Sequence, residues 1–530
     1  MKLNLASLNE TKFWADAGVN VPSFDVPAMQ QRTKENPVWV HFGAGNIFRG
    51  YVANLQNELL NAGLADRGIS AVDSSDGDQI VKVYAPFDNL TLLVSLYGDG
   101  SSKKDIVAGV AEAVHADWKK PDQLARLKAI FTNPGLQMCS FTITEKGYTN
   151  KGEADFAAGP DAPVSVMAKV ASMLLERFKA GKLPIAVVSM DNCSHNGEKL
   201  KNSILQIVDE WNKRGFVPSE FVEYVSDEAV VSFPWSMIDK ITPRPNADIA
   251  AQLTQLGIEN MDIIPREKGA PVAPFVNAES SQYLVIEDRF PNGRPALEKV
   301  GVYMTDRDTV NKTERMKVTT CLNPLHTALA VLGCLLGYDR IYKEMRDEDL
   351  KGLVERIGHV EGMPVVTNPV ILSPDDFLEE VITQRLPNPY IPDMPQRIAC
   401  DTSQKIPVRF GETIKSYIAS DTLDLNNLEA IPFAIAGWMR YLLAVDDNLE
   451  VFELPADPMI PVLQEKLAGV EAGNPGTYSG QLSAILCDAS IFGADLTKTV
   501  LYEKIEKHFV SMLSGAGAVR SELHSLVVSF

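Results

Sequence analysis

The chain has 530 residues, of which 45% are hydrophobic and 22% are charged, as in soluble globular proteins. This length exceeds one ordinary hydrophobic core, so we expect two large domains. With 50 basic and 69 acidic residues the net charge is −19. That charge disfavours nucleic acid and membrane surfaces as partners, but it allows an anionic small molecule in a locally basic pocket.

The first part of the chain alternates strand and helix patterns after a polar, irregular N-terminal extension over residues 1–36. The strand PVWVHF leads into a glycine-containing turn and an amphipathic helix. Later strand-like runs are GISAVDSS, DNLTLLVSLYG, MCSFTIT and LPIAVVSM, and helical runs such as VSVMAKVASMLLERFKAG lie between them. This alternation predicts an α/β fold with a mostly parallel sheet covered on both faces over residues 37–296. A Rossmann-type dinucleotide-binding domain is one such fold.

The pattern changes after about residue 296. Long amphipathic or apolar segments follow, and strand signals are almost absent. Examples are LNPLHTALAVLGCLLGYDRIYKEM, DDFLEEVITQRL, LEAIPFAIAGWMRYLLAV and TVLYEKIEKHFVSMLSG. We therefore predict a mainly α-helical domain over residues 297–530, and a polar cluster near its start makes it the candidate substrate and catalytic domain.

The glycine turn in WVHFGAGNIFRG is a candidate phosphate-binding element. Gly43 and Gly45 end the first predicted strand, where glycines let a pyrophosphate approach the backbone and a helix N-terminus offers free N–H groups. Phe48 occupies the position where the dinucleotide fingerprint has a third small residue, so an ordinary tight turn is the alternative. Asp73 ends the next strand and could bind the adenosine ribose, which favours NAD over NADP; Asp76 is a rival for this role.

A cluster of polar residues precedes the most apolar helix, in ERMKVTTCLNPLH. Asn323 and Pro324 predict the helix start, with Asn323 as the cap, and His326 falls in the first turn. Glu314 and Lys317 share a face if the preceding segment is helical. A capped core helix with an incidental surface ion pair is the alternative interpretation.

Two further polar clusters weaken that alternative. SMDNCSHNGEKL follows the strand LPIAVV and so falls at the carboxyl edge of the sheet, where α/β domains bind ligands. FPWSMIDKITPRPN places Asp239 between apolar neighbours and proline-containing turns.

The sequence also indicates whether to expect a metal site, disulfide bonds or a membrane span. The six cysteines show no C-x-x-C spacing, and no H-E-x-x-H motif or Cys/His cluster is present, so we expect no metal site. Without a signal-like N-terminus, the cysteines are expected to be reduced thiols in a cytoplasmic protein. We expect no membrane span, because no continuous apolar run reaches the roughly 18 residues that a span needs.

An ordered series of motifs gives the chain a specific resemblance over most of residues 38 to 440. The motifs are GAGNIFRG, TITEKGY, DNCSHNG, MIDKITP, SSQYLVIEDRFPNGRP, ERMK with NPLH, and RLPNPYIPD followed by DTSQKIP. In these motifs the chain resembles the polyol-specific long-chain dehydrogenases, the mannitol 2-dehydrogenase family, which includes fructuronate and tagaturonate reductases.

The resemblance implies a metal-independent, nicotinamide-dependent oxidation of a secondary alcohol. Lys317 would be the general acid/base, because a lysine removed from water can accept a proton near neutral pH. The other implied catalytic residues are Asn192 and Asn323 as an oxyanion hole, His326 as the residue that orients the substrate, and Glu314 and Asp239 as proton relays. The matching motifs imply that NAD is bound by Gly43, Gly45, Asn46, Phe48, Arg49, Asp73 and Thr144.

The chain departs from the family pattern in two places. The family spacing is K-x-x-x-x-N-x-x-H, whereas five residues separate Lys317 from Asn323. One extra residue rotates a continuous helix by about 100°, so the lysine assignment requires a bulge or a break before Pro324. The second departure is Asp393, where mannitol dehydrogenases tend to carry a histidine.

The resemblance also bears on the substrate, a sugar acid or a polyol. It is closest to the uronate-reducing branch, which implies interconversion of D-fructuronate and D-mannonate, with mannitol 2-dehydrogenase and tagaturonate reductase activities as alternatives. Arg385 and Lys405 are the candidate cations for a substrate carboxylate, with ordinary surface charges as the alternative. A non-catalytic sensor that binds NAD is a further alternative, and we expect a monomer.

Overall fold

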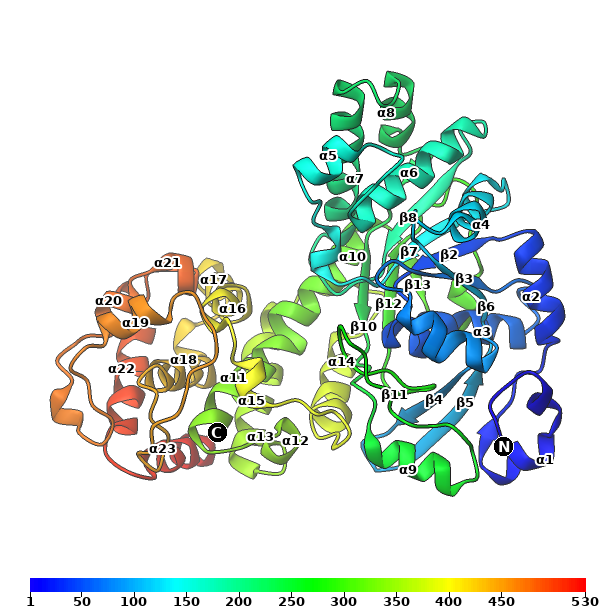
Figure 1. Cartoon of the computed structure of the whole chain (residues 1–530). Helices are drawn as coiled ribbons and strands as arrows, with labels where there is room; N and C mark the ends of the chain where they lie inside the picture. Colours follow the sequence, from blue (N-terminus) through cyan, green and yellow to red (C-terminus); the bar gives the residue numbers. More distant parts are fainter. The chain divides into compact units, whose positions relative to one another are not determined.

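The computed structural model describes all 530 residues and divides into two compact units (Figure 1). The first unit contains Met1–Tyr97 and Ser101–Asn311, and the second contains Gly98–Gly100 and Lys312–Phe530. The alternation of strand and helix patterns in the sequence ends after residue 296, but the first compact unit continues to Asn311. The residues in between belong to the first unit because the strand β13 (Tyr303–Thr305) pairs with its strand β12 (Tyr283–Glu287).

A six-stranded, entirely parallel sheet forms the centre of the first unit. Its spatial order is β6-β3-β2-β7-β8-β9, which is the 3-2-1-4-5-6 order of a doubly wound Rossmann fold. The prediction of a Rossmann-type sheet domain followed by a helical domain is confirmed. The strands are β2 (Trp39–Phe42), β3 (Ile69–Asp73), β6 (Val110–His115), β7 (Met138–Phe141), β8 (Ile185–Ser189) and β9 (Val231–Ser232).

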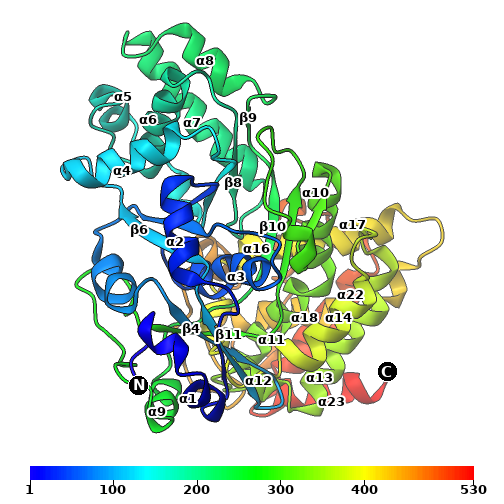
Figure 2. The same ribbon diagram turned by 90° about the vertical axis from the view of Figure 1, so that its right-hand side faces the viewer.

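Both faces of this sheet are buried, which explains why its strands are continuous apolar runs. Val40, Phe42 and Phe141 point into one core with the helices α4 (Pro121–Thr132), α6 (Val166–Lys179), α7 (Asn196–Lys213) and α8 (Ser219–Ser226), which Figures 1 and 2 show grouped together. Trp39 and Val188 point into the other core, with the π-helical turn η2 (Phe48–Val52) and α3 (Ala53–Asn61).

Two further sheets lie in the first unit and were not expected. One has the order β1-β5-β4-β11, and the other has the order β10-β12-β13. The run DNLTLLVSLYG is β4 (Thr91–Leu96), but it pairs antiparallel with β5 (Ser102–Val107), because the short segment between them cannot make the crossover that parallel strands need. The other strands are β1 (Val19–Asn20), β10 (Ser236–Asp239) and β11 (Phe275–Glu279), and two further helices are α5 (Glu153–Ala158) and α9 (Ala247–Gln255).

The expectation of an irregular N-terminal extension is wrong. Residues 1–36 contain α1 (Thr11–Asp16), β1 and α2 (Val26–Glu35), and β1 pairs parallel with β5. Trp14 is fully buried, and its indole N–H donates to the Ser7 carbonyl oxygen at 2.7 Å. One buried tryptophan and one added strand therefore hold this polar segment in place.

The second unit is helical and has no strand of its own. Its core is built on α11 (Asn323–Leu335) and on α18 (Ala430–Tyr441), in which every residue is buried. The other helices are α12 (Ile341–Glu344), α13 (Glu348–Glu355), α14 (Pro374–Glu380), α15 (Pro395–Ile398), α16 (Thr402–Arg409), α17 (Gly411–Ala419), α19 (Ile460–Lys466), α20 (Ser483–Leu486), α21 (Ala489–Phe492), α22 (Leu501–Met512) and α23 (Ala518–Val528).

One helical segment is long and apolar enough to cross a membrane by length and composition. It runs over Arg307–Leu335, although we had expected no segment to reach this length. In the structure 72% of its apolar window is buried inside the protein. That burial is typical of a core helix, whose apolar side chains contact other side chains instead of lipid.

A buried polar network joins β2 to β7 beneath the glycine turn. His41 is fully buried, and its two ring nitrogens lie 2.7 Å from Ser140 Oγ and 2.8 Å from Thr142 Oγ1. Trp39 Nε1 donates to the same Ser140 hydroxyl at 2.7 Å, and the Thr142 hydroxyl donates to the Gly43 carbonyl oxygen at 3.2 Å. Burial lowers the pKa of His41 from 6.5 to about 3, against a smaller opposite effect of the Gly43 backbone.

His41 should make the stability of the protein depend on pH. Between pH 6.5 and 3 the unfolded chain binds a proton at His41 that the folded chain does not, so stability is lost as pH falls below 6.5. At pH 5 this histidine should cost about 2 kcal/mol. The free energy of unfolding of wild type and His41→Gln is measured with urea at pH 7.5 and at pH 5. The decrease between the two pH values should be about 2 kcal/mol smaller in the variant. The exposed His524→Gln serves as control, and an equal loss in His41→Gln and wild type would contradict the assignment.

Candidate active site

The carboxyl ends of β2, β7 and β8 lie next to one another at one edge of the parallel sheet. The glycine turn follows β2, Thr142 to Thr144 follow β7, and Asp191 and Asn192 follow β8. β2 and β7 are the neighbouring strands at which the strand order reverses, the place where open α/β sheets bind their ligands. The sheet therefore brings three segments that are far apart in the sequence to one edge.

The two glycines of the turn have different roles. Gly43 has φ +111°, and a Cβ there would lie 2.1 Å from the Thr142 carbonyl oxygen, so only glycine fits between β2 and β7. A Cβ on Gly45 would meet nothing within 4 Å, and its φ is not positive. Gly45 thus leaves open space at the start of the helix behind it, as close approach of a phosphate to the backbone requires.

Three other predicted cofactor residues, Asn46, Phe48 and Arg49, serve the fold around this turn. The Arg49 side chain is fully buried and donates to the Ala273 carbonyl oxygen at 2.9 Å and to Asn46 Oδ1 at 3.0 Å. Phe48 is also fully buried and stacks on His41, with ring centroids 4.2 Å apart. A role of Phe48 or Arg49 at a cofactor would therefore have to come from the backbone.

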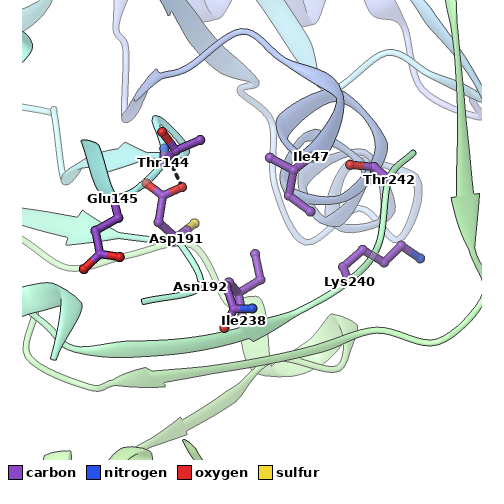
Figure 3. A pocket seen from close by; sticks show the side chains of 9 residues that line it. Ile47, Thr144, Glu145, Asp191, Asn192, Ile238, Lys240 and Thr242 are labelled. Atoms are coloured by element: carbon purple, nitrogen blue, oxygen red, sulfur yellow. Dashed lines mark hydrogen bonds between the residues drawn. The ribbon is translucent and has the colours of Figure 1, made fainter. Parts of the chain in front are cut away.

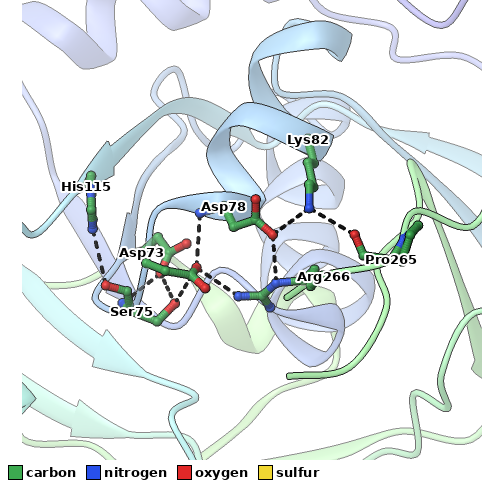
Figure 4. Close-up of polar contacts among 8 residues, drawn as sticks. Asp73, Ser75, Asp78, Lys82, His115, Pro265 and Arg266 are labelled. Atoms are coloured by element: carbon green, nitrogen blue, oxygen red, sulfur yellow. Dashed lines mark hydrogen bonds and ion pairs between the residues drawn. The ribbon is translucent and has the colours of Figure 1, made fainter. Parts of the chain in front are cut away.

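The acidic residue at the end of β3 has one unused acceptor atom (Figure 4). Asp73 is buried; its Oδ1 accepts from the backbone N–H of Ser75 at 2.8 Å and from the Ser75 hydroxyl at 2.6 Å, while its Oδ2 has no hydrogen-bond partner. The rival Asp76 is ion-paired with Arg266 at 2.9 Å, and Asp78 pairs with Lys82 at 2.8 Å. Asp73 is therefore the carboxylate with spare hydrogen-bonding capacity.

A pocket of about 260 Å³ opens at this edge within the first unit (Figure 3). Two predicted site residues, Thr144 and Asn192, line it together, and Asp239 ends the strand β10 between two further lining residues. The remaining lining residues are Ile47, Glu145, Met190, Asp191, Ile238, Lys240 and Thr242. Ile47 comes directly after the glycine turn, so the turn, β7, β8 and β10 all contribute to one cavity.

Asp191 is a residue of this pocket that we did not single out from the sequence. Its carboxylate accepts the backbone N–H groups of Ile143 and Thr144, both at 2.9 Å, and the Tyr148 hydroxyl at 2.6 Å. Burial raises the pKa of Asp191 even though these hydrogen bonds act to lower it. Thr144 has φ +65°, a strained conformation for a β-branched residue, and Asp191 holds it there. The sequence feature that could have identified Asp191 is an acidic residue just after the end of a buried strand, β8.

In the second unit, the predicted break before Pro324 is confirmed. Residues Lys317–Cys321 form a π-helical turn, η7, in which the Leu322 N–H donates to the Lys317 carbonyl oxygen, five residues back, at 3.1 Å. Leu322 then leaves helical geometry with φ −129°, and α11 begins at Asn323. The extra residue is thus absorbed in one wide turn at the end of α10 (Arg307–Met316).

The residues around this turn are partly as predicted. Lys317 is buried, Glu314 is half-buried, and His326 lies in the first turn of α11. The prediction that Asn323 caps the helix is wrong: Leu322 is the cap residue, and Asn323 is the first helical residue. The N–H donors of the Asn323 amide would be available in either position, because a cap residue uses its side-chain oxygen as an acceptor.

Asp393, the second departure from the family pattern, lies beside His326. His326 Nε2 is 3.4 Å from Asp393 Oδ2, and Arg397 pairs with the other carboxylate oxygen. Burial acts to raise the pKa of Asp393, but His326 and Arg397 outweigh it, and the pKa is lowered. The His326 ring therefore lies next to a carboxylate that is itself fixed by an arginine, but its Nε2 has no hydrogen-bond partner.

The two cations proposed for a substrate carboxylate differ in their surroundings. Arg385 is buried at the end of a second π-helical turn, η10 (Val381–Arg385). Lys405, in α16, donates its ammonium hydrogens to the carbonyl oxygens of Ile398 and Cys400, at the end of α15. Its ammonium therefore already has two protein acceptors.

The strand order, the glycine turn and the pocket at the switch point define a Rossmann-type dehydrogenase. Residues 38–299 match the family model of the mannitol dehydrogenase Rossmann domain, and residues 309–513 match that of the mannitol dehydrogenase C-terminal domain. The chain belongs to the mannitol dehydrogenase family, and it is an oxidoreductase.

Relatives of known name cover almost the whole chain. A D-mannonate oxidoreductase of Thermotoga maritima is 50% identical over 538 residues, 99% of each chain. A mannitol 2-dehydrogenase of Phaeosphaeria nodorum is 27% identical over 97% of this chain and 83% of the relative. The solved ternary complex of Pseudomonas fluorescens mannitol 2-dehydrogenase with NAD and D-mannitol is 26% identical, covers 100% of both chains and has a TM-score of 0.70.

Proposed function

We propose that this protein is an NAD-dependent oxidoreductase that interconverts D-fructuronate and D-mannonate. The observation that carries the proposal is the 50% identity, over 99% of both chains, with a protein named D-mannonate oxidoreductase. The solved relative that binds NAD and D-mannitol supports the cofactor and the class of reaction.

The residues of the first unit fit a dinucleotide. The open space at Gly45 suits a pyrophosphate, and the unpaired Asp73 Oδ2 suits a ribose hydroxyl. When bound, NAD supplies a carbon that accepts or returns a hydride. The Asp73 carboxylate also favours NAD over NADP, because it would repel a 2′-phosphate, and Arg266, which could attract one, is paired with Asp76 and Asp78.

The chain supplies the proton chemistry and the charge stabilisation. In the proposed reaction Lys317 takes the proton from the substrate hydroxyl, or returns it in the reverse direction. The amides of Asn192 and Asn323 donate to the developing alkoxide, and His326 orients the substrate. Glu314 and Asp239 would pass the proton between Lys317 and solvent. The Asn323 amide has two N–H donors that can serve in this role.

A substrate screen tests the activity. D-fructuronate, D-tagaturonate and D-fructose are each mixed with NADH and the wild-type protein, and NADH oxidation is followed by absorbance. We expect D-fructuronate to give the highest kcat/KM. A preference for D-tagaturonate or D-fructose would replace the proposed substrate, and tight NADH binding with no turnover of any of them would identify a non-catalytic NAD sensor.

The glycine pair tests the cofactor site separately from the fold. Gly45→Ala places a methyl group in open space, so stability should stay within about 0.5 kcal/mol of wild type while NADH affinity falls at least about tenfold. Gly43→Ala, the matched variant, should lose both stability and NADH binding, because its methyl group would overlap Thr142. NADH fluorescence titration and thermal unfolding measure the two properties. Wild-type NADH affinity in Gly45→Ala would show that the cofactor does not approach this turn.

The lysine is tested by Lys317→Ala. Loss of the general base should lower kcat about 10²- to 10⁴-fold while NADH affinity is retained. Lys498→Ala, in which an 80% exposed lysine side chain is removed, is the control and should keep wild-type turnover. Near-normal turnover in Lys317→Ala would place the base elsewhere.

A further inference from the structure

Arg409, at the end of α16, contacts the first turn of α11. Its Nη1 donates to the Thr327 hydroxyl and lies 3.4 Å from the Asn323 carbonyl oxygen. Asn323 and His326 belong to this same turn. The guanidinium is therefore held beside the two polar residues of α11 that the proposed reaction uses.

Three fully buried arginines, Arg49, Arg177 and Arg440, use their guanidinium groups mainly for hydrogen bonds to backbone carbonyl oxygens. Arg177 donates from Nε, Nη1 and Nη2 to backbone oxygens, and Arg440 does the same. Arg49 is anchored to the backbone and to Asn46. These three are structural: their donors hold loops and chain ends together.

Arg409 differs because only one of its three nitrogens is used. Nε and Nη2 make no hydrogen bond, and no carboxylate pairs with the guanidinium. Nε and Nη2 form one edge of the planar group, the edge that binds a carboxylate through two parallel hydrogen bonds. The contact of Nη1 with Thr327 fixes the orientation of this edge.

The surroundings leave this cation without compensation. Burial lowers the pKa of Arg409 to about 10. Lys405 lies one turn earlier on α16, and burial together with the repulsion from Arg409 lowers its pKa. Asp393, the carboxylate beside His326, is already engaged by Arg397 and His326. A half-buried cation that has no carboxylate partner is costly, and an anionic ligand lowers that cost.

We propose that Arg409 is the residue that recognises the substrate carboxylate, through Nε and Nη2, and that it makes the site selective for hexuronates over neutral ketoses. This inference rests on the proposed function and names the specificity residue of the same site. It replaces Lys405 in that role, because the Lys405 ammonium already donates to two carbonyl oxygens whereas one edge of Arg409 is unused. A hexuronate carries its carboxylate a few bonds from the ketone, so both groups can be bound around one helical turn.

The test compares charged and neutral substrates in Arg409→Gln and Arg409→Lys, with the exposed Arg346→Gln as control. For D-fructuronate we expect Arg409→Gln to raise KM about 100-fold, with a smaller change in kcat. Arg409→Lys should recover part of the loss, because it restores the charge but not the two-pronged contact. Binding of D-mannonate to the NAD-loaded protein should weaken in parallel, whereas binding of D-mannitol and any turnover of D-fructose should change less than threefold.

The outcomes separate this inference from the proposed function. A structural role of Arg409 would weaken all four ligands alike, and that result, or an unchanged KM for D-fructuronate, overturns the inference alone. A wild-type protein that does not oxidise NADH with D-fructuronate overturns the proposed function and the inference with it. Thermal unfolding of each variant identifies misfolding, in which case Arg409→Lys decides between the two roles.

Discussion

The wide turn between Lys317 and Cys321 is the backbone constraint on which the polar groups of the second unit depend. A regular α-helix with five residues between Lys317 and Asn323 would place the lysine about 100° from where a four-residue spacing places it. The π-helical turn takes up the additional residue, since the Leu322 N–H reaches back five residues to Lys317. Pro324 then fixes the start of α11, because it lacks an N–H and is suited only to the first turn. π-turns of this kind recur at functional sites.

Each unit holds its polar groups by buried contacts instead of surface loops. In the first unit, the His41 network joins β2 to β7, and Asp191 fixes the segment after β7 through two backbone N–H groups. In the second unit, α11 is rooted among buried side chains, and Arg409 joins its first turn to α16. Rigid supports of this kind hold polar groups in fixed positions. Groups that need not reorient during a reaction stabilise a developing charge most effectively.

The parallel sheet could be predicted because its strands are buried on both faces and alternate with amphipathic helices. The two other sheets could not, since they pair strands that are far apart in the sequence, such as β4 with β11. The extra residue before Asn323 predicted a break, because helix geometry leaves no other way to keep the spacing. Whether Asn323 or Leu322 caps α11 depends on a single residue of backbone geometry, which composition does not determine.

Among the site residues, too, some could be predicted from local sequence patterns and others depend on tertiary contacts. The glycine turn and Asp73 follow from local patterns, but the burial of Phe48 and Arg49 depends on packing against His41 and Ala273, from other parts of the chain. Arg409 gave no signal in the sequence, where it is one arginine in a helix; its unused donors are visible only once its partners are known. Sequence patterns therefore identify the elements of the site, and tertiary contacts decide which side chains are available for a ligand.

The measurement that tests the account most directly is the single-turnover rate of NADH oxidation by D-fructuronate in a variant that lacks Thr319. This deletion removes the extra residue of the π-helical turn, and Thr319→Ala, which keeps the length, is the matched control. The account predicts that NADH affinity is unchanged in both variants, that Thr319→Ala turns over like wild type, and that the deletion keeps the rate within about tenfold of wild type, because it gives the family spacing K-x-x-x-x-N-x-x-H, at which a regular helix holds Lys317 in the same place relative to Asn323 and His326. A deletion variant that folds and binds NADH but reacts at least about 100-fold more slowly than Thr319→Ala would contradict it.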